Sequence, residues 1–157
     1  MQTDALISEL RDARADVLAA LEAVTPESLT TPGLVGEWSG RELIAHLGYW
    51  AGHATDVLHA VEGRRADEIG EGEPPVDDVN ETVARIARGT DLATVRKREA
   101  ATIDALIERL AALDPALLAE RLPDGATLAE AIREDGADHY REHAADLRPV
   151  LEEAPRG

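Results

Sequence analysis

Apolar residues recur every three or four positions along the first 24 residues of the chain. This spacing matches the turn of an α-helix and places one apolar stripe along one side of it. The stripe predicts a long helix that packs against other helices along its whole length. It ends at the segment TPESLTTPGLVGEW, whose two prolines and two glycines do not continue a helix. The residues of the stripe are Leu6, Leu10, Ala13, Val17, Leu21 and Val24.

A second helix is predicted to begin near residue 40. Ser39 and Glu42 form an S-x-x-E capping box, in which the hydroxyl and the carboxylate satisfy free backbone N–H groups at a helix start. Trp38, directly before this cap, is expected to pack the preceding loop onto the helix. The helix is expected to end at the Gly-Arg-Arg sequence of residues 63–65.

Two more helices follow a long connection. Residues 64–89 form a crossover loop with room for a short helix, and connections of this length are often functional. Apolar periodicity predicts the third helix over about residues 90–113. A second capping box, Thr127 to Glu130, opens a fourth helix that is expected to run unbroken to Val150. The predicted fold is all-α: a single domain over residues 1–157, folded as a four-helix bundle with a long crossover loop between helices two and three.

Composition narrows the chemistry and the partners. Aromatic residues make up 3% of the chain and Phe is absent, so the core must be built from Leu, Ala, Val and Ile. The formal net charge of −16 lacks the basic face that phosphate binding needs, which predicts no nucleic acid and no anionic membrane as partner. No apolar run has the length of a membrane span, and the acidic N-terminus does not resemble a signal peptide, so we expect a cytoplasmic protein. Because Cys is absent, any thiol chemistry needs a thiol supplied from outside.

The sequence DHYREH, residues 138–143, places two histidines four positions apart on the fourth helix. Their side chains therefore point the same way, about 6 Å apart, and can bind one metal ion. His46 lies on the apolar stripe of the second helix and supplies a third imidazole. Three protein ligands leave coordination positions open to water or substrate, as in a catalytic site. The alternative, that the histidines are structural and pair with acids without metal, stays open.

Other side chains near these histidines are candidates for a pocket. Tyr49, Trp50 and Tyr140 either line a substrate pocket or belong to the core. His53 is too far along its helix to share the ion, and is expected to hydrogen-bond locally or line the mouth of a pocket. Glu99 is the one charge on the inner stripe of the third helix. It is a candidate general base, a residue behind the metal ligands, or, as we prefer, a side chain that reaches water.

Two segments of the chain resemble the DinB-like family of four-helix bundles. The sequence WSGRELIAHL, from Trp38 to Leu47, is similar to the family pattern W-S-x-x-E-L-x-x-H-L, and DHYREH is similar to D-H-x-x-x-H. The superfamily also includes YfiT-like metal-dependent hydrolases and the N-terminal domain of mycothiol-dependent maleylpyruvate isomerase. The resemblance is nearest to the branch that includes small self-resistance proteins.

The resemblance implies a divalent metal, zinc or nickel in many members, held by His46, His139 and His143, and often a homodimer. Members include thiol-dependent transferases that use mycothiol or bacillithiol, isomerases and hydrolases. We therefore expect a metal-dependent enzyme, a thiol-dependent S-transferase or a hydrolase, that acts on a small electrophilic molecule. The alternative is a self-resistance protein that sequesters a small molecule or metal without catalysis.

Overall fold

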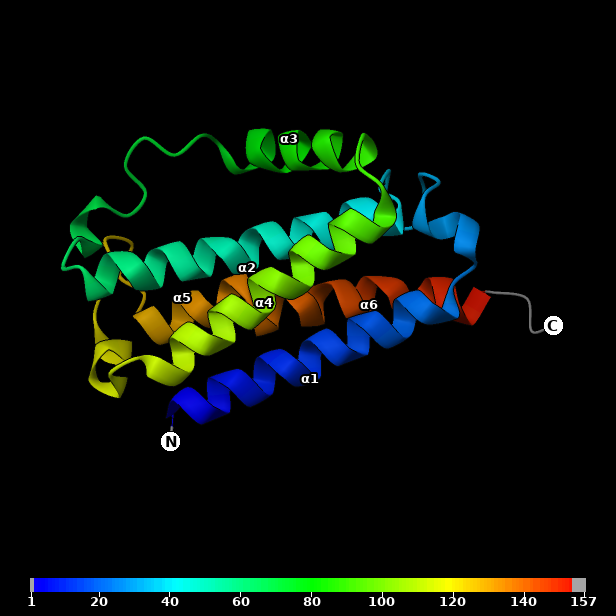
Figure 1. Ribbon diagram of the computed structural model, residues 1–157. Helices are drawn as coiled ribbons and strands as arrows, with labels where there is room; N and C mark the ends of the chain where they lie inside the picture. The colour runs from blue at the N-terminus through cyan, green and yellow to red at the C-terminus, as the bar shows by residue number, and fades with distance from the viewer. Residues whose placement is uncertain (1, 154–157) are drawn as a thin grey trace.

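The structure is a computed structural model that describes residues 2–153, and it is built from α-helices (Figure 1). The described residues contain no β-strand, and two isolated bridges, Val35 with Trp38 and Arg121 with Thr127, are the β-type pairings they make. The all-α prediction is confirmed. The helices are α1 (Gln2–Ala23), α2 (Gly40–Glu62), α3 (Val76–Arg88), α4 (Leu92–Ala112), α5 (Leu128–Asp135) and α6 (Ala137–Glu153), with short 3₁₀ turns at Pro26–Leu29, Ala66–Glu68 and Pro115–Ala119.

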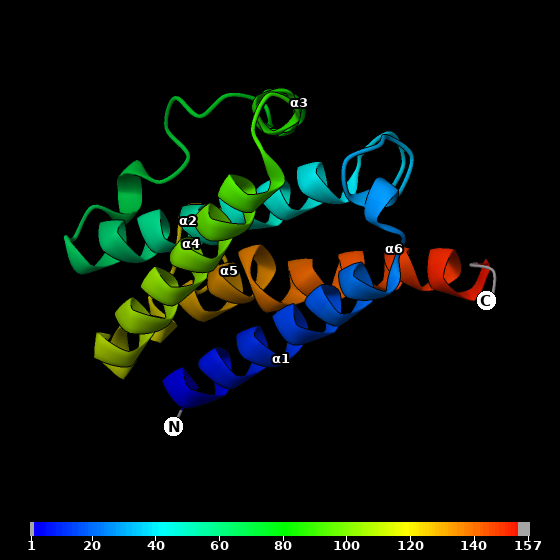
Figure 2. The ribbon, with the colours of Figure 1, turned by 45° about the vertical axis from the view of Figure 1, so that its right-hand side comes forward.

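Helices α1, α2, α4 and α6 form the bundle, and α5 leads into α6 at one end (Figures 1 and 2). α2 and α4 run in the same direction, so the chain between them must return along the length of the bundle. That return is the predicted crossover over residues 64–89, and half of its residues belong to helix α3. Both views show α3 on the outer side of α2, away from α1.

Both predicted capping boxes are present. The Ser39 hydroxyl accepts from the backbone N–H of Glu42 at 3.4 Å, and the Glu42 carboxylate accepts from the backbone N–H of Ser39 at 3.2 Å. Thr127 and Glu130 make the equivalent pair at 3.2 and 2.8 Å. These contacts begin α2 and α5 at the residues that the sequence indicated.

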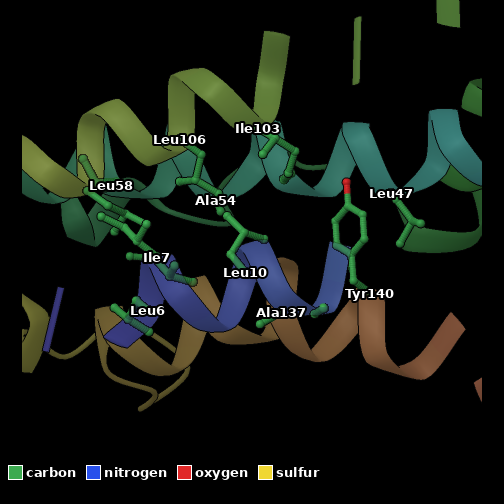
Figure 3. Packing of buried hydrophobic residues seen from close by; sticks show 14 of the residues in the cluster. Leu6, Ile7, Leu10, Leu47, Ala54, Leu58, Ile103, Leu106, Ala137 and Tyr140 are labelled. Carbon is green, nitrogen blue, oxygen red and sulfur yellow. The ribbon is translucent and has the colours of Figure 1, made fainter. Parts of the chain in front are cut away.

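Aliphatic side chains fill the space between the helices (Figure 3). The stripe predicted on α1 is buried from Leu6 to Leu21 and faces α6 and α4. Tyr140 is the largest side chain in this core and is 1% exposed. With so few aromatic residues, the packing depends on leucines that interdigitate between helices, in agreement with the composition.

The fourth predicted helix is not continuous, and this expectation is wrong. The chain breaks at Gly136, so α5 ends at Asp135 and α6 begins at Ala137. A Cβ atom at residue 136 would lie 2.8 Å from the carbonyl oxygen of Ile132 and 3.4 Å from the Leu10 side chain. Glycine is therefore required where α5 turns into α6 against α1, and the break sets the rotation with which α6 enters the bundle.

Helix α3 is attached to the bundle near both of its ends. The Trp50 indole on α2 donates to the Asn80 side chain at 2.9 Å. At the other end, Arg88 donates to the buried carboxylate of Glu42 at 3.0 Å and also pairs with Glu81. The crossover therefore has a fixed position over α2. Of the helices described, none combines the length and the apolar character needed to cross a membrane.

We predict that Gly136→Ala destabilises the protein and that Gly89→Ala does not. The new methyl group at residue 136 meets a backbone carbonyl that cannot move without disturbing α5, which costs about 1–3 kcal/mol. At Gly89, also at a helix end, the nearest atom to an added Cβ is 3.7 Å away, which is ordinary contact. Urea unfolding of the two variants and the parent measures the difference, and equal stabilities for the two variants would contradict it.

Candidate metal centre

Three histidines from two helices meet at the contact between α2 and α6. His46 lies in the second turn of α2, and His139 and His143 lie one turn apart on α6. His46 is buried and the other two are half-buried. One ring nitrogen from each residue lies within 4.8 Å of the others, so the structure brings together all three residues that the sequence singled out. That they bind a metal stays a prediction.

The nitrogen Nε2 of His139 lies between the other two imidazoles. It is 2.8 Å from Nε2 of His46 and 3.2 Å from Nε2 of His143. An imidazole nitrogen carries either one proton or one lone pair, so this atom cannot form good hydrogen bonds with both neighbours. Three lone pairs directed at one point are the arrangement that a shared cation satisfies.

The distances also fit a metal ion of the zinc class. With metal–nitrogen bonds of about 2.0–2.1 Å, two ligating nitrogens lie about 3.0–3.4 Å apart, depending on the coordination angle. The observed separations of 2.8 and 3.2 Å need only small side-chain adjustments to reach that range. Imidazole nitrogen suits zinc, nickel, copper and iron, so the donor set fits the metals that the sequence resemblance implies.

The surroundings keep His46 and His139 neutral. Burial, and then the neighbouring rings of His139 and His143, lowers the pKa of His46 to about 3. Burial, and then His143, lowers the pKa of His139 to about 4. A protonated imidazole cannot ligate, so both residues are in the metal-competent form at neutral pH.

Two contacts orient the rings from outside. Asp146 lies 3.0 Å from Nδ1 of His143, so that nitrogen donates its proton to the carboxylate and Nε2 faces the other imidazoles. The Trp38 ring packs against the His46 ring, with 4.7 Å between the two ring centroids. This contact confirms that Trp38 packs the preceding loop onto α2. Nδ1 of His46 is buried and has no hydrogen-bond partner within residues 2–153. The Asp146 contact was not predicted, although its position three residues after His143 places it on the same side of the helix.

Glu99 is buried at the centre of the bundle, and the expectation that it reaches water is wrong. Its side chain is 3% exposed and forms an ion pair with Arg14 of α1. The hydroxyl of Tyr140 donates to the same carboxylate at 3.3 Å. Burial and the nearby carboxylate raise the pKa of Tyr140 well above its usual value, so its hydroxyl remains a donor. Glu99 therefore joins α1, α4 and α6, and Tyr140 stands next to the ligand candidate His139.

The pocket candidates divide into two groups. Tyr49 and His53 line a cavity of about 470 Å³ beneath α3, while Trp50 bonds to α3 and is not among the lining residues. Tyr140 belongs to the core, so its assignment to a pocket is wrong. Figure 3 shows its ring rising from α6 with the hydroxyl directed away from that helix.

His53 forms hydrogen bonds with two carboxylates from distant parts of the chain and not with neighbours along its own helix. Its Nδ1 lies 2.6 Å from the Asp135 carboxylate at the end of α5, and its Nε2 lies 3.2 Å from Glu73 in the crossover. The hydrogen bond to Asp135, with a further contribution from Glu73, raises the pKa of His53 to about 9 despite its partial burial. The protonated ring therefore links α2 to α5 and to the crossover.

Comparison with known proteins identifies the family. A family model described as the DinB superfamily matches residues 9–148. Among solved structures, the chain is similar to the colibactin self-resistance protein ClbS in complex with a dsDNA. The TM-score is 0.77 and the sequence identity is 15%, and the match covers 98% of this chain and 96% of that chain. It is also similar to a variant of the mycothiol-dependent maleylpyruvate isomerase, with a TM-score of 0.70, 15% identity, and coverage of 93% of this chain and 60% of that chain. No curated protein sequence matches.

The ClbS complex corrects one inference from composition. The acidic net charge led to the prediction that nucleic acid is excluded as a partner, and a protein with this fold in complex with a dsDNA overturns that prediction. The physical reason is that net charge sums over the whole surface, whereas a contact with phosphate depends on the local arrangement of charges.

We predict that His53 makes stability depend on pH in the alkaline range. Its pKa is about 9 in the folded protein and about 6.5 when unfolded, so its contribution is complete below pH 6.5 and is lost as pH rises through 9. Because Glu73 is exposed, we expect a loss of about 1–3 kcal/mol in unfolding free energy across this window.

Urea unfolding of metal-free protein at pH 6.5 and 9.5 measures this loss. His53→Gln should remove most of the difference between the two pH values. His59→Gln is the matched control, because His59 is exposed on the same helix and contacts Arg109 rather than a carboxylate. The same pH dependence in His53→Gln and the parent would refute the role of His53.

Proposed function

The chain belongs to the DinB superfamily, and from that membership we propose that it is a metal-dependent enzyme acting on a small electrophilic molecule. The reaction is a thiol-dependent S-transfer or a hydrolysis at a divalent zinc or nickel ion held by His46, His139 and His143. The observation that carries the proposal is the convergence of one imidazole nitrogen from each of the three histidines. The ion supplies Lewis-acid activation of a water or thiol near neutral pH.

The residues of the chain supply the surroundings for this chemistry. His46 and His139 stay neutral because they are buried, and the contact with Asp146 holds the His143 ring with Nε2 toward the other two. Trp38 covers one side of His46 and limits the access of solvent to it. Since the chain contains no Cys, the nucleophile in the transferase version is an external low-molecular-weight thiol such as mycothiol or bacillithiol.

A second candidate is a non-catalytic protein that sequesters a small molecule or metal. The similarity to the self-resistance protein ClbS, which extends over nearly the whole of both chains, favours keeping this candidate. At 15% identity, however, both structural neighbours are evidence for the fold and not for a substrate. The choice between catalysis and sequestration therefore depends on turnover.

We predict that protein purified without chelator carries close to one divalent ion per chain and that His139→Ala and His143→Ala each lose most of it. Two remaining imidazoles bind a zinc-class ion far more weakly than three. Elemental analysis measures the metal, and His59→Ala is the control because it removes an exposed imidazole from α2. Thermal unfolding with and without added zinc gives a second measure, since an ion that binds the native state raises Tm. Equal metal content in His139→Ala and the parent would end the proposal.

We also predict product in clear excess over protein when the metal-loaded chain meets an electrophile. Monochlorobimane with mycothiol, bacillithiol or cysteine tests the transferase version, and p-nitrophenyl acetate without thiol tests the hydrolase version. His139→Ala should fall to the uncatalysed rate in whichever assay responds. Binding of one equivalent of the electrophile, with no product in either assay, would favour sequestration.

A further inference from the structure

A cavity of about 470 Å³ lies between α3 and the pair formed by α2 and α4. None of the three histidines of the metal centre lines it. Its volume falls in the range of small-molecule pockets. The cavity is therefore a candidate binding site in its own right, separate from the reaction proposed above.

The cavity is bounded by the close approach of α2 to α4 and by the attachments that hold α3 over them. Gly48 lets α2 approach α4 closely, because a Cβ atom there would lie 3.3 Å from the backbone of Glu99. α3 is held over this pair near its two ends, by Asn80 and by Arg88. Val83, Ile86 and Ala87 lie between those two attachments and line the cavity.

The cavity carries apolar surface that the fold leaves uncovered. Ile86 is 56% exposed and Tyr49 is 42% exposed, and both line the cavity. They are two of the three large apolar side chains that are exposed among residues 2–153. Exposed apolar surface gathered in a concavity is typical of a site that binds an apolar group.

Arg98 supplies the charge. It lines the cavity from α4, and its guanidinium makes no ion pair or hydrogen bond with the side chains of the described residues. The other charges at the cavity are arranged differently: Glu99 is paired with Arg14, and His53 is held by Asp135 and Glu73. Asp56 also lines the cavity from α2, eight residues after Gly48, which is about 12 Å along the helix. Because Gly48 lies against Glu99, Asp56 is at the other end of the cavity from Glu99.

We propose that this cavity binds a small amphipathic monoanion, whose apolar body lies against Ala45, Val83 and Ile86 and whose carboxylate or similar group pairs with Arg98. The guanidinium presents paired N–H donors that match a carboxylate. The apolar walls bind the rest of the molecule by burial. The ligand class is thus an aliphatic or aromatic acid small enough for the cavity.

Isothermal titration of metal-free protein with octanoate tests the proposal, with octylammonium as a probe of the same chain length and opposite charge. Octanoate should bind one per chain and at least about tenfold more tightly than octylammonium. Arg98→Gln should weaken octanoate binding by about tenfold or more, because a charge-assisted hydrogen bond is lost. Arg96→Gln is the matched control: this arginine is exposed on the same helix and does not line the cavity.

A second pair of variants tests the location. Val83→Trp fills the cavity and should abolish octanoate binding, whereas Thr82→Trp, on the exposed side of α3, should not. Circular dichroism and Tm establish that each variant is folded. His139→Ala should bind octanoate like the parent, so failure at this cavity and failure at the metal centre are distinguishable. Equal affinity of the parent and Arg98→Gln, equal affinity for the two probes, or no octanoate binding below about 1 mM would overturn the proposal.

Discussion

All four helices of the bundle meet at one buried carboxylate. Glu99 of α4 pairs with Arg14 of α1, accepts from Tyr140 of α6 and packs against Gly48 of α2. A charge in this position is tolerated only when its partners are in place, because an unpaired buried carboxylate has a large desolvation cost. The carboxylate therefore fixes how the helices are rotated relative to one another. Tyr140 is adjacent to His139, so the same contact sets the direction in which α6 presents its histidines.

Local signals in the sequence were enough to predict the helices and the three imidazoles. Capping boxes act through residues three apart, and apolar stripes and the His139–His143 pair follow from helical periodicity. His46 could be placed because its own helix start was known. The features that were missed depend on contacts between distant segments: the environment of Glu99 and the break at Gly136 forced by Leu10 and Ile132. Of the cavity beneath α3, only Tyr49 and His53 on α2 had been named as pocket candidates, and the walls from α3 and α4 had not. Periodicity along one helix contains no information about them.

The net charge of the chain does not reveal which charged side chains pair with one another in the structure. The net charge of −16 is a property of the whole chain, yet the individual groups that shape the structure are specific pairs. His53 holds α5 and the crossover through two carboxylates, and Arg88 reaches a carboxylate buried under α3. These pairs use individual acids whose roles the net charge does not reveal. Composition was therefore a poor guide to partners, as the ClbS complex demonstrates.

The crossover is joined to the bundle through side chains that include Asn80 and Arg88, and residues 70–78 are exposed. Changes in its length or sequence leave the buried carboxylate and the histidine triad untouched, since none of those residues belongs to it. Substitutions in the exposed part of this segment can therefore alter the surface of this chain while the packing that holds the four bundle helices together stays the same.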